Sequence, residues 1–227
     1  MRVTISARGA APVSWLAPDR YGRLAEVLMA PSAAAVAATP LWQGQQHDEG
    51  VSLRMNTASG PLALHYRLAD DGSLLVEGDA TPVQPFFNLN GGATDVGDHM
   101  LQIDADFFIE ISEAGVPAAK AMVGGTAFDF RQPAAIGPRL AWLDPQLKRA
   151  GGFNHCYCMR AHSKGRAGLL REVARAVDPG SGRQLLVSTT EPAVQFASGP
   201  ALDGFSLATQ SGTPGKHTTV YRVLLQH

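Results

Sequence analysis

Short runs of alternating apolar and polar residues set the strongest limit on what this chain can form. They recur between residues 3 and 225, and each is closed by glycine, proline, aspartate or asparagine. Successive side chains of a strand point to opposite faces, so the pattern is typical of strands with one buried face. The chain is therefore expected to be an all-β protein.

Two stretches carry a turn signal between such runs. Asp71-Gly72 separates two alternating segments in LADDGSLLV, and DPGSGR occupies residues 178–183. Glycine at these places permits the positive φ that tight hairpin turns require. Each stretch predicts an antiparallel hairpin.

Helical candidates are few. Residues 25–40 are rich in alanine, but Pro31 and Pro40 bracket the tract. Residues 168–177 fit a helical period, although we interpret them as a strand. We find no repeat, long charge run or linker, so residues 1–227 are expected to form a single domain.

The charge balance excludes several classes of partner. The chain has 19 basic and 20 acidic residues and a formal net charge of -1, so binding to nucleic acid or to a membrane surface is not expected. A small-molecule partner is expected instead. No run approaches the roughly 20 apolar residues that span a bilayer, and the first ten residues do not resemble a signal peptide.

Cys156 and Cys158 are expected to be free thiols in the cytoplasm.

Residues 81–92, TPVQPFFNLNGG, combine two prolines, two aromatics and three amides without any ionisable side chain. This rigid stretch belongs to a series of ordered motifs that resembles the aldose 1-epimerases, also called galactose mutarotases. The other motifs are DVGDHMLQIDADFF, VGGTAFDFRQPAAIG, GGFNHCYCM, DPGSGRQLLVSTTEPAVQF and GFSLATQ. The resemblance implies an antiparallel β-supersandwich and a carbohydrate-binding cleft.

The resemblance also implies which chemistry is absent. In the family, a histidine protonates the sugar ring oxygen and a glutamate removes the anomeric proton, which is paired acid and base catalysis. These positions fall on Gln84 and Ala208, and the family's sugar-binding aspartate falls on Asn154. The tract of about residues 25–50 is too short for the family's second histidine and its arginine. Since glutamine does not exchange a proton near neutral pH and alanine has no polar group, ordinary mutarotation is not expected.

Other residues are candidates for the site. If the family geometry holds, alternation places Asn154 and Cys156 on the cleft face, where Cys156 either contributes chemistry or packs as a small hydrophobe. Phe86 could stack on a ligand or belong to the core. The remaining expected binding residues are Gln84, Asn88, Glu191 and Ala208.

A loop cluster offers a substitute acid and base. His47, Asp48 and Glu49 follow the shortened tract, and His47 and Glu49 are the first catalytic candidates; the alternative is a solvated hairpin. His99 and the Asp129–Arg131 pair are interpreted as structural. Cys156, Cys158 and His162 lack a fourth ligand, so we expect neither a metal nor a cofactor.

Three functional hypotheses follow. The first is a shortened family member that binds a sugar-like small molecule. The second is an enzyme recruited to a different reaction, such as epimerase, lyase or cyclase chemistry in biosynthesis. The third is a non-catalytic sugar-binding or regulatory module.

Overall fold

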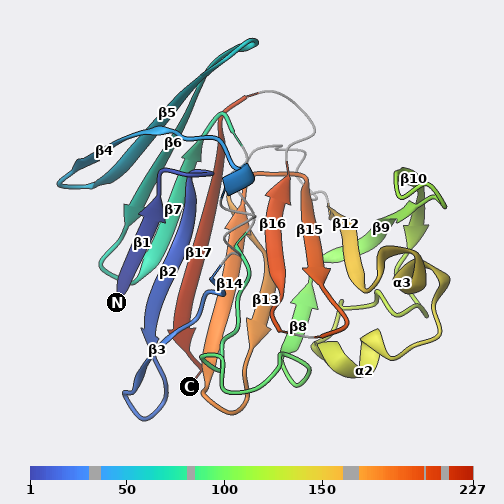
Figure 1. The fold of residues 1–227 in the computed structure, drawn as a ribbon. Helices are drawn as coiled ribbons and strands as arrows, with labels where there is room; N and C mark the ends of the chain where they lie inside the picture. The colour runs from blue at the N-terminus through green and yellow to red at the C-terminus, as the bar shows by residue number, and fades with distance from the viewer. Residues whose placement is uncertain (31–36, 81–84, 161–168, 202, 211–214, 227) are drawn as a thin grey trace.

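The computed structural model describes the chain except for residues 31–36, 81–84, 161–168, 202, 211–214 and 227 (Figure 1). All strand pairs within its sheets are antiparallel, and the strands form sheets of three, five and nine. The all-β supersandwich expected from the sequence is confirmed. The single-domain boundaries and the shortening near residues 25–50 stay predictions.

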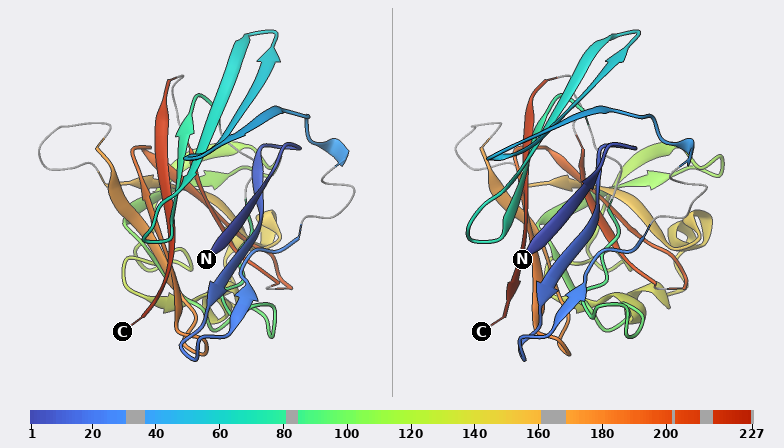
Figure 2. Two further views of the ribbon diagram at one scale, coloured as in Figure 1. Left: turned by 90° about the vertical axis from the view of Figure 1, so that its left-hand side faces the viewer. Right: turned by 60° about the vertical axis from the view of Figure 1, so that its left-hand side comes forward.

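The nine-stranded sheet has the order β11-β8-β13-β14-β17-β7-β6-β5-β4. Its strands are β4 (Gln43–His47), β5 (Gly50–Thr57), β6 (Gly60–Leu68), β7 (Ser73–Gly78), β8 (Met100–Ile103), β11 (Ala134–Ala135), β13 (Arg171–Val177), β14 (Arg183–Thr189) and β17 (His217–Leu225). Strands β5 and β6 project together beyond the body of the molecule (Figure 2). The strand interpretation of residues 168–177 is confirmed for residues 171–177, which form β13; residue 168 lies outside the described residues.

The five-stranded sheet has the order β10-β9-β12-β15-β16. It contains β9 (Ala105–Ile111), β10 (Pro117–Met122), β12 (Phe153–Met159), β15 (Ala193–Ser198) and β16 (Ser206–Gln210). The three-stranded sheet contains β1 (Arg2–Ser6), β2 (Ala11–Pro18) and β3 (Leu24–Glu26).

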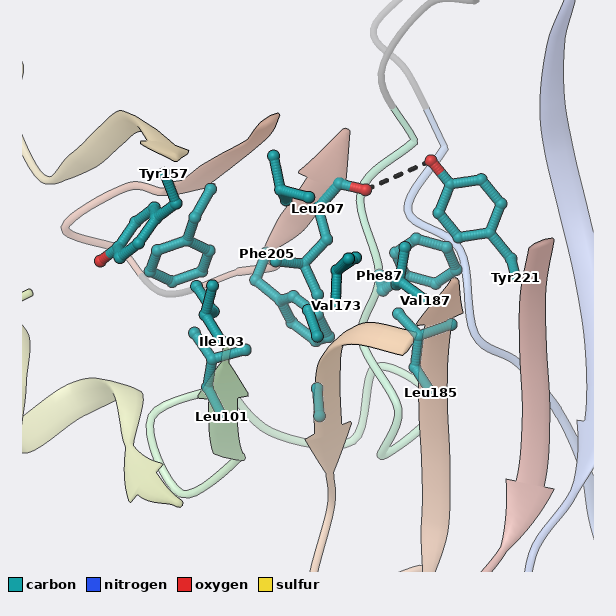
Figure 3. Packing of buried hydrophobic residues seen from close by; sticks show 14 of the residues in the cluster. Phe87, Leu101, Ile103, Tyr157, Val173, Leu185, Val187, Phe205, Leu207 and Tyr221 are labelled. Carbon is teal, nitrogen blue, oxygen red and sulfur yellow. Dashed lines mark hydrogen bonds between the residues drawn. The ribbon is translucent and has the colours of Figure 1, made fainter. Parts of the chain in front are cut away.

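Buried aromatic side chains join the two larger sheets (Figure 3). Phe87 packs 6.0 Å from Phe205 and 6.0 Å from Tyr221, measured between ring centroids. The Tyr221 hydroxyl, on β17, donates a hydrogen bond of 3.2 Å to the carbonyl of Leu207 on β16. This contact fixes the edge of the five-stranded sheet against the nine-stranded sheet.

Both predicted hairpin turns are present. Gly72 has φ of +79°, and its N–H donates to the carbonyl of Ala69 between β6 and β7. Gly182 has φ of +74° in the turn that joins β13 to β14. The Asp178 carboxylate accepts the N–H groups of Gly180 and Ser181 and so closes that turn.

Two short helices were not predicted. They are α2 (Ile136–Leu140) and α3 (Pro145–Ala150). Asp144 caps α3 by accepting the Gln146 N–H at 2.8 Å, and the helix ends at Gly151 with φ of +65°. An aspartate followed by proline is the local signal that could have revealed α3. In the alanine-rich tract, residues 24–26 form β3 and residues 37–38 are helical, while residues 31–36 lie outside the described residues.

The buried side chain of Arg183 forms hydrogen bonds to three separate segments of the chain. Its side chain is 2% exposed, and its guanidinium donates to the carbonyls of Ala17, Pro18, Arg23 and Leu89. Burial lowers the pKa of the Arg183 guanidinium, but arginine stays charged because its ordinary pKa is so high. The planar fork of arginine therefore holds the β2–β3 turn and the loop after Asn88 on the end of β14.

Replacement of Arg183 by lysine tests how much these hydrogen bonds contribute to stability. An ammonium group cannot reach all four carbonyls, so we expect Arg183→Lys to lower the free energy of unfolding by about 2–4 kcal/mol. Chemical denaturation measures the change. Arg175→Lys is the matched control, because Arg175 pairs with Glu172 on the surface and its replacement is expected to cost less than about 0.5 kcal/mol. Equal effects of the two substitutions would contradict the structural role of Arg183.

Candidate functional site

Strand β12 presents two faces of different character. His155 and Tyr157 are buried, whereas Asn154 is exposed and both cysteines are half-buried. The predicted alternation is therefore confirmed. Cys156 and Cys158 are free, as expected, but they are less buried than a core residue would be.

Neighbouring strands extend this face. Cys156 lies opposite Gln195 on β15, and Gln195 lies opposite Ala208 on β16. Residues directly opposite in a sheet share a face, so the side chains of Asn154, Cys156, Gln195 and Ala208 form one surface. We call this surface the amide face. It brings together three of the residues expected from the sequence, Asn154, Cys156 and Ala208.

An amide pair lies at the centre of the amide face. The Gln195 Nε2 donates to the Asn154 Oδ1 at 2.8 Å. The pair retains the two N–H groups of Asn154 and the second N–H of Gln195 as donors, and the amide oxygen of Gln195 as an acceptor. A ligand group that both donates and accepts, such as a hydroxyl, complements this arrangement.

The amide face carries no group that exchanges protons near neutral pH. Asn154 and Gln195 do not ionise in that range, and Ala208 is 6% exposed and apolar. Burial, and then the neighbouring Cys158, raises the pKa of the Cys156 thiol to about 11. The thiol is thus protonated at neutral pH. These four side chains offer hydrogen-bonding groups and a protonated thiol.

His155 lies on the opposite, buried face of β12. Its Nδ1 accepts the Asn154 N–H at 3.2 Å, and its ring packs on Phe128 with a centroid distance of 4.5 Å. Burial lowers the pKa of His155 to about 4, so the ring is neutral near pH 7. His155 packs in the core on the face of β12 opposite the amide face.

The segment after the second proline of TPVQPFFNLNGG is fixed by its backbone and one amide. Phe87 is buried and pairs with Phe205 through two backbone hydrogen bonds, whereas Phe86 is 37% exposed. The Asn88 amide nitrogen donates to the carbonyls of Thr94 and Asp203, so Asn88 positions the loop. Gln84 lies outside the described residues.

Glu191 is buried between β14 and β15. Its N–H donates to the Thr189 hydroxyl at 3.1 Å, and its Oε2 has no hydrogen-bond partner. The side chain is 6% exposed, so the structure does not present Glu191 on an open surface.

His217 is a candidate that the sequence reasoning missed. It lines a cavity of about 10 Å³ together with Ala208, Thr209 and Thr219, and its side chain is 7% exposed. Such a volume holds about one water molecule.

Gln195 was also missed as a site residue, although it stands in the TTEPAVQF motif. Its pairing with Asn154 depends on strand register, which no local signal reveals.

The loop candidates lie elsewhere. His47 ends β4, the edge strand of the nine-stranded sheet, and Asp48 and Glu49 form the turn to β5. All three line a cavity of about 220 Å³ beside β1 and β6, which shares no residue with the cavity at Ala208. The structure does not bring His47 or Glu49 to the amide face.

The structural interpretation of three further residues is confirmed. The His99 Nε2 accepts the Leu89 N–H at 3.1 Å, and the ring is fully buried. Asp129 and Arg131 form a two-bond ion pair at 2.8 and 2.7 Å. Within the described ranges, no three His, Cys, Asp or Glu side chains are grouped to hold a metal ion, and His162 lies outside those ranges.

Comparisons with known proteins place this geometry in a family. The family described as aldose 1-epimerase matches residues 41–217. The chain is 38% identical to bovine galactose mutarotase over 63% of its own length and 42% of the relative's, and 33% identical to aldose 1-epimerase of Escherichia coli over 70% and 45%. The chain thus spans less than half the length of these curated relatives.

Solved structures show the same fold. A GalM/aldose epimerase homologue from C. elegans aligns with 99% of this chain and 96% of its own, with a TM-score of 0.76 at 16% identity. Galactose 1-epimerase from Lactobacillus acidophilus aligns with 99% of this chain and 79% of its own, with a TM-score of 0.65 at 21% identity. In the described parts of this chain, no helix is long and apolar enough to cross a bilayer.

The Cys156 thiol provides a direct test of the local environment. Because burial raises its pKa to about 11 from 9.0, about 100-fold less thiolate is expected near pH 8 than for an ordinary thiol. We expect the rate at which Ellman's reagent reacts with Cys158→Ser protein to rise with pH up to about pH 11. Cys156→Ser protein provides the matched control. A rate that reaches its plateau below pH 9 would contradict the described environment.

Proposed function

Since the chain belongs to the aldose 1-epimerase family, we propose that it binds an uncharged, hydroxylated small molecule of the sugar class on the amide face. The Asn154–Gln195 pair carries this proposal, because it offers amide N–H donors and an amide oxygen acceptor side by side. Phe86 is exposed enough to offer an aromatic surface to the apolar side of a sugar ring. The free thiols fit a reducing compartment such as the cytoplasm.

Ordinary mutarotation is not part of the proposal. That reaction needs an acid that protonates the ring oxygen and a base that takes the anomeric proton. Ala208 stands where the resemblance places the base, and Gln84 stands where it places the acid. A sugar could therefore be held without its ring being opened.

Calorimetric titration with galactose and glucose tests the binding proposal. We expect Gln195→Ala to weaken binding about five- to tenfold, because one hydrogen bond is worth about 1 kcal/mol. Asn56→Ala, on the projecting strand β5, is the matched surface control and should leave binding unchanged. If no sugar binds, or if Gln195→Ala binds as tightly as the unmodified chain, the proposal fails.

A recruited enzyme is the second candidate, and His217 favours it. The imidazole of His217 lines the same cavity as Ala208, the position where the resemblance places the base, and imidazole is the side chain that most often acts as a general acid or base. His47 and Glu49 remain the loop candidates for such an activity.

Substitutions separate the two sets of candidates. If the chain isomerises or cleaves a sugar, His217→Gln should lower kcat about 100-fold or more, because glutamine keeps hydrogen bonding but not proton transfer. His47→Ala and Glu49→Ala should then have little effect. An activity that survives His217→Gln and is lost in the loop variants would assign catalysis to the loop instead.

A further inference from the structure

Two histidines approach one hydroxyl on the projecting sheet, away from the amide face. The His47 Nε2 lies 2.8 Å from the Ser52 Oγ, and the His65 Nδ1 lies 3.0 Å from the same oxygen. The three side chains come from β4, β5 and β6, which are neighbours in the sheet. Two imidazole nitrogens therefore converge on one point from two strands.

Strand register maintains this convergence. Ser52 lies opposite His65 on one side and opposite Gln45 on the other, and His47 lies two residues beyond Gln45 on the same face. His47 also lies opposite Gly50, which has no side chain to intervene. Both imidazoles are exposed, so each can rotate toward a shared ligand.

The surrounding charges are mixed. Glu77 lies directly opposite His65 on β7, and Asp48 and Glu49 follow His47 in the turn. Arg67 lies two residues beyond His65 on the same face of β6. Glu77 accepts a hydrogen bond of 3.5 Å from the Thr218 hydroxyl, so it contributes negative charge beside His65 and is not counted as a ligand.

We propose that His47 and His65 form a surface site for a late first-row divalent metal ion, such as Zn²⁺, Ni²⁺ or Cu²⁺. Neutral imidazole is a preferred ligand of these ions, at nitrogen–metal distances of about 2.0–2.1 Å for zinc. The ion takes the place between the rings where the Ser52 hydroxyl now accepts or donates hydrogen bonds. Water, or the Ser52 oxygen after a small shift, completes the coordination.

The other described histidines do not form such a pair. His99 and His155 are buried, and each packs against aromatic rings. His217 is also buried, in the cavity beside Ala208. Among the described histidines, exposure and convergence coincide at His47 and His65.

Titration of the untagged full chain with NiCl₂ or ZnCl₂, followed by calorimetry, tests the site. We expect His47→Ala and His65→Ala each to weaken binding at least about tenfold, because two linked ligands bind far more tightly than one. Ser52→Ala should retain binding, since the hydroxyl is not required. Circular dichroism checks that each variant folds.

Further variants exclude other sources of binding. His162→Ala, His227→Ala and the double change Cys156→Ser with Cys158→Ser should leave the affinity unchanged. Binding that disappears in one of these controls, or that is unaffected by folded His47→Ala protein, would overturn the proposal. Absence of measurable binding to the unmodified chain would also overturn it.

Discussion

The buried guanidinium of Arg183 is the interaction on which the remaining structure depends. A charged group inside a protein is costly unless its donors are satisfied, and Arg183 satisfies them with backbone carbonyls alone. One of these carbonyls belongs to Leu89, next to Asn88. Two residues earlier, Phe87 forms a two-bond bridge with Phe205, directly before β16. A continuous path thus connects Arg183 to the strand that carries Ala208.

The amide face is positioned by backbone pairing between three strands. Backbone pairing between β12, β15 and β16 sets the positions of Asn154, Gln195 and Ala208, and that pairing does not depend on which side chains ionise. Asn154, Gln195 and Ala208 carry no charge, which is why the proposed ligand is a neutral molecule with hydroxyl groups.

Local patterns accounted for most of the fold and for part of the site. Alternation placed Asn154 and Cys156 on one face, and the Asp71-Gly72 pair fixed a hairpin, because both signals act within a few residues. The pairing of Gln195 with Asn154 joins residues on two strands, and its discovery requires the register between them. The convergence of His47 and His65 has the same origin.

A short helix and two site positions could not be predicted from local patterns, for different reasons. Helix α3 has only six residues, too few to display a helical period, and its one local signal is the Asp144-Pro145 start. His217 lies outside the sequence motifs that resemble the family, and only packing brings it beside Ala208. The motifs placed the family acid at Gln84 from spacing alone, and that position lies outside the described residues.

The central claim is that this chain keeps a sugar-binding frame without a proton-transferring pair. Polarimetry on fresh α-galactose and α-glucose, with purified chain at several concentrations, tests it most directly. The account predicts that rotation decays at the rate of buffer alone at every concentration. A rate that increases in proportion to the concentration of the chain, and that is unchanged after repeated purification, would contradict it.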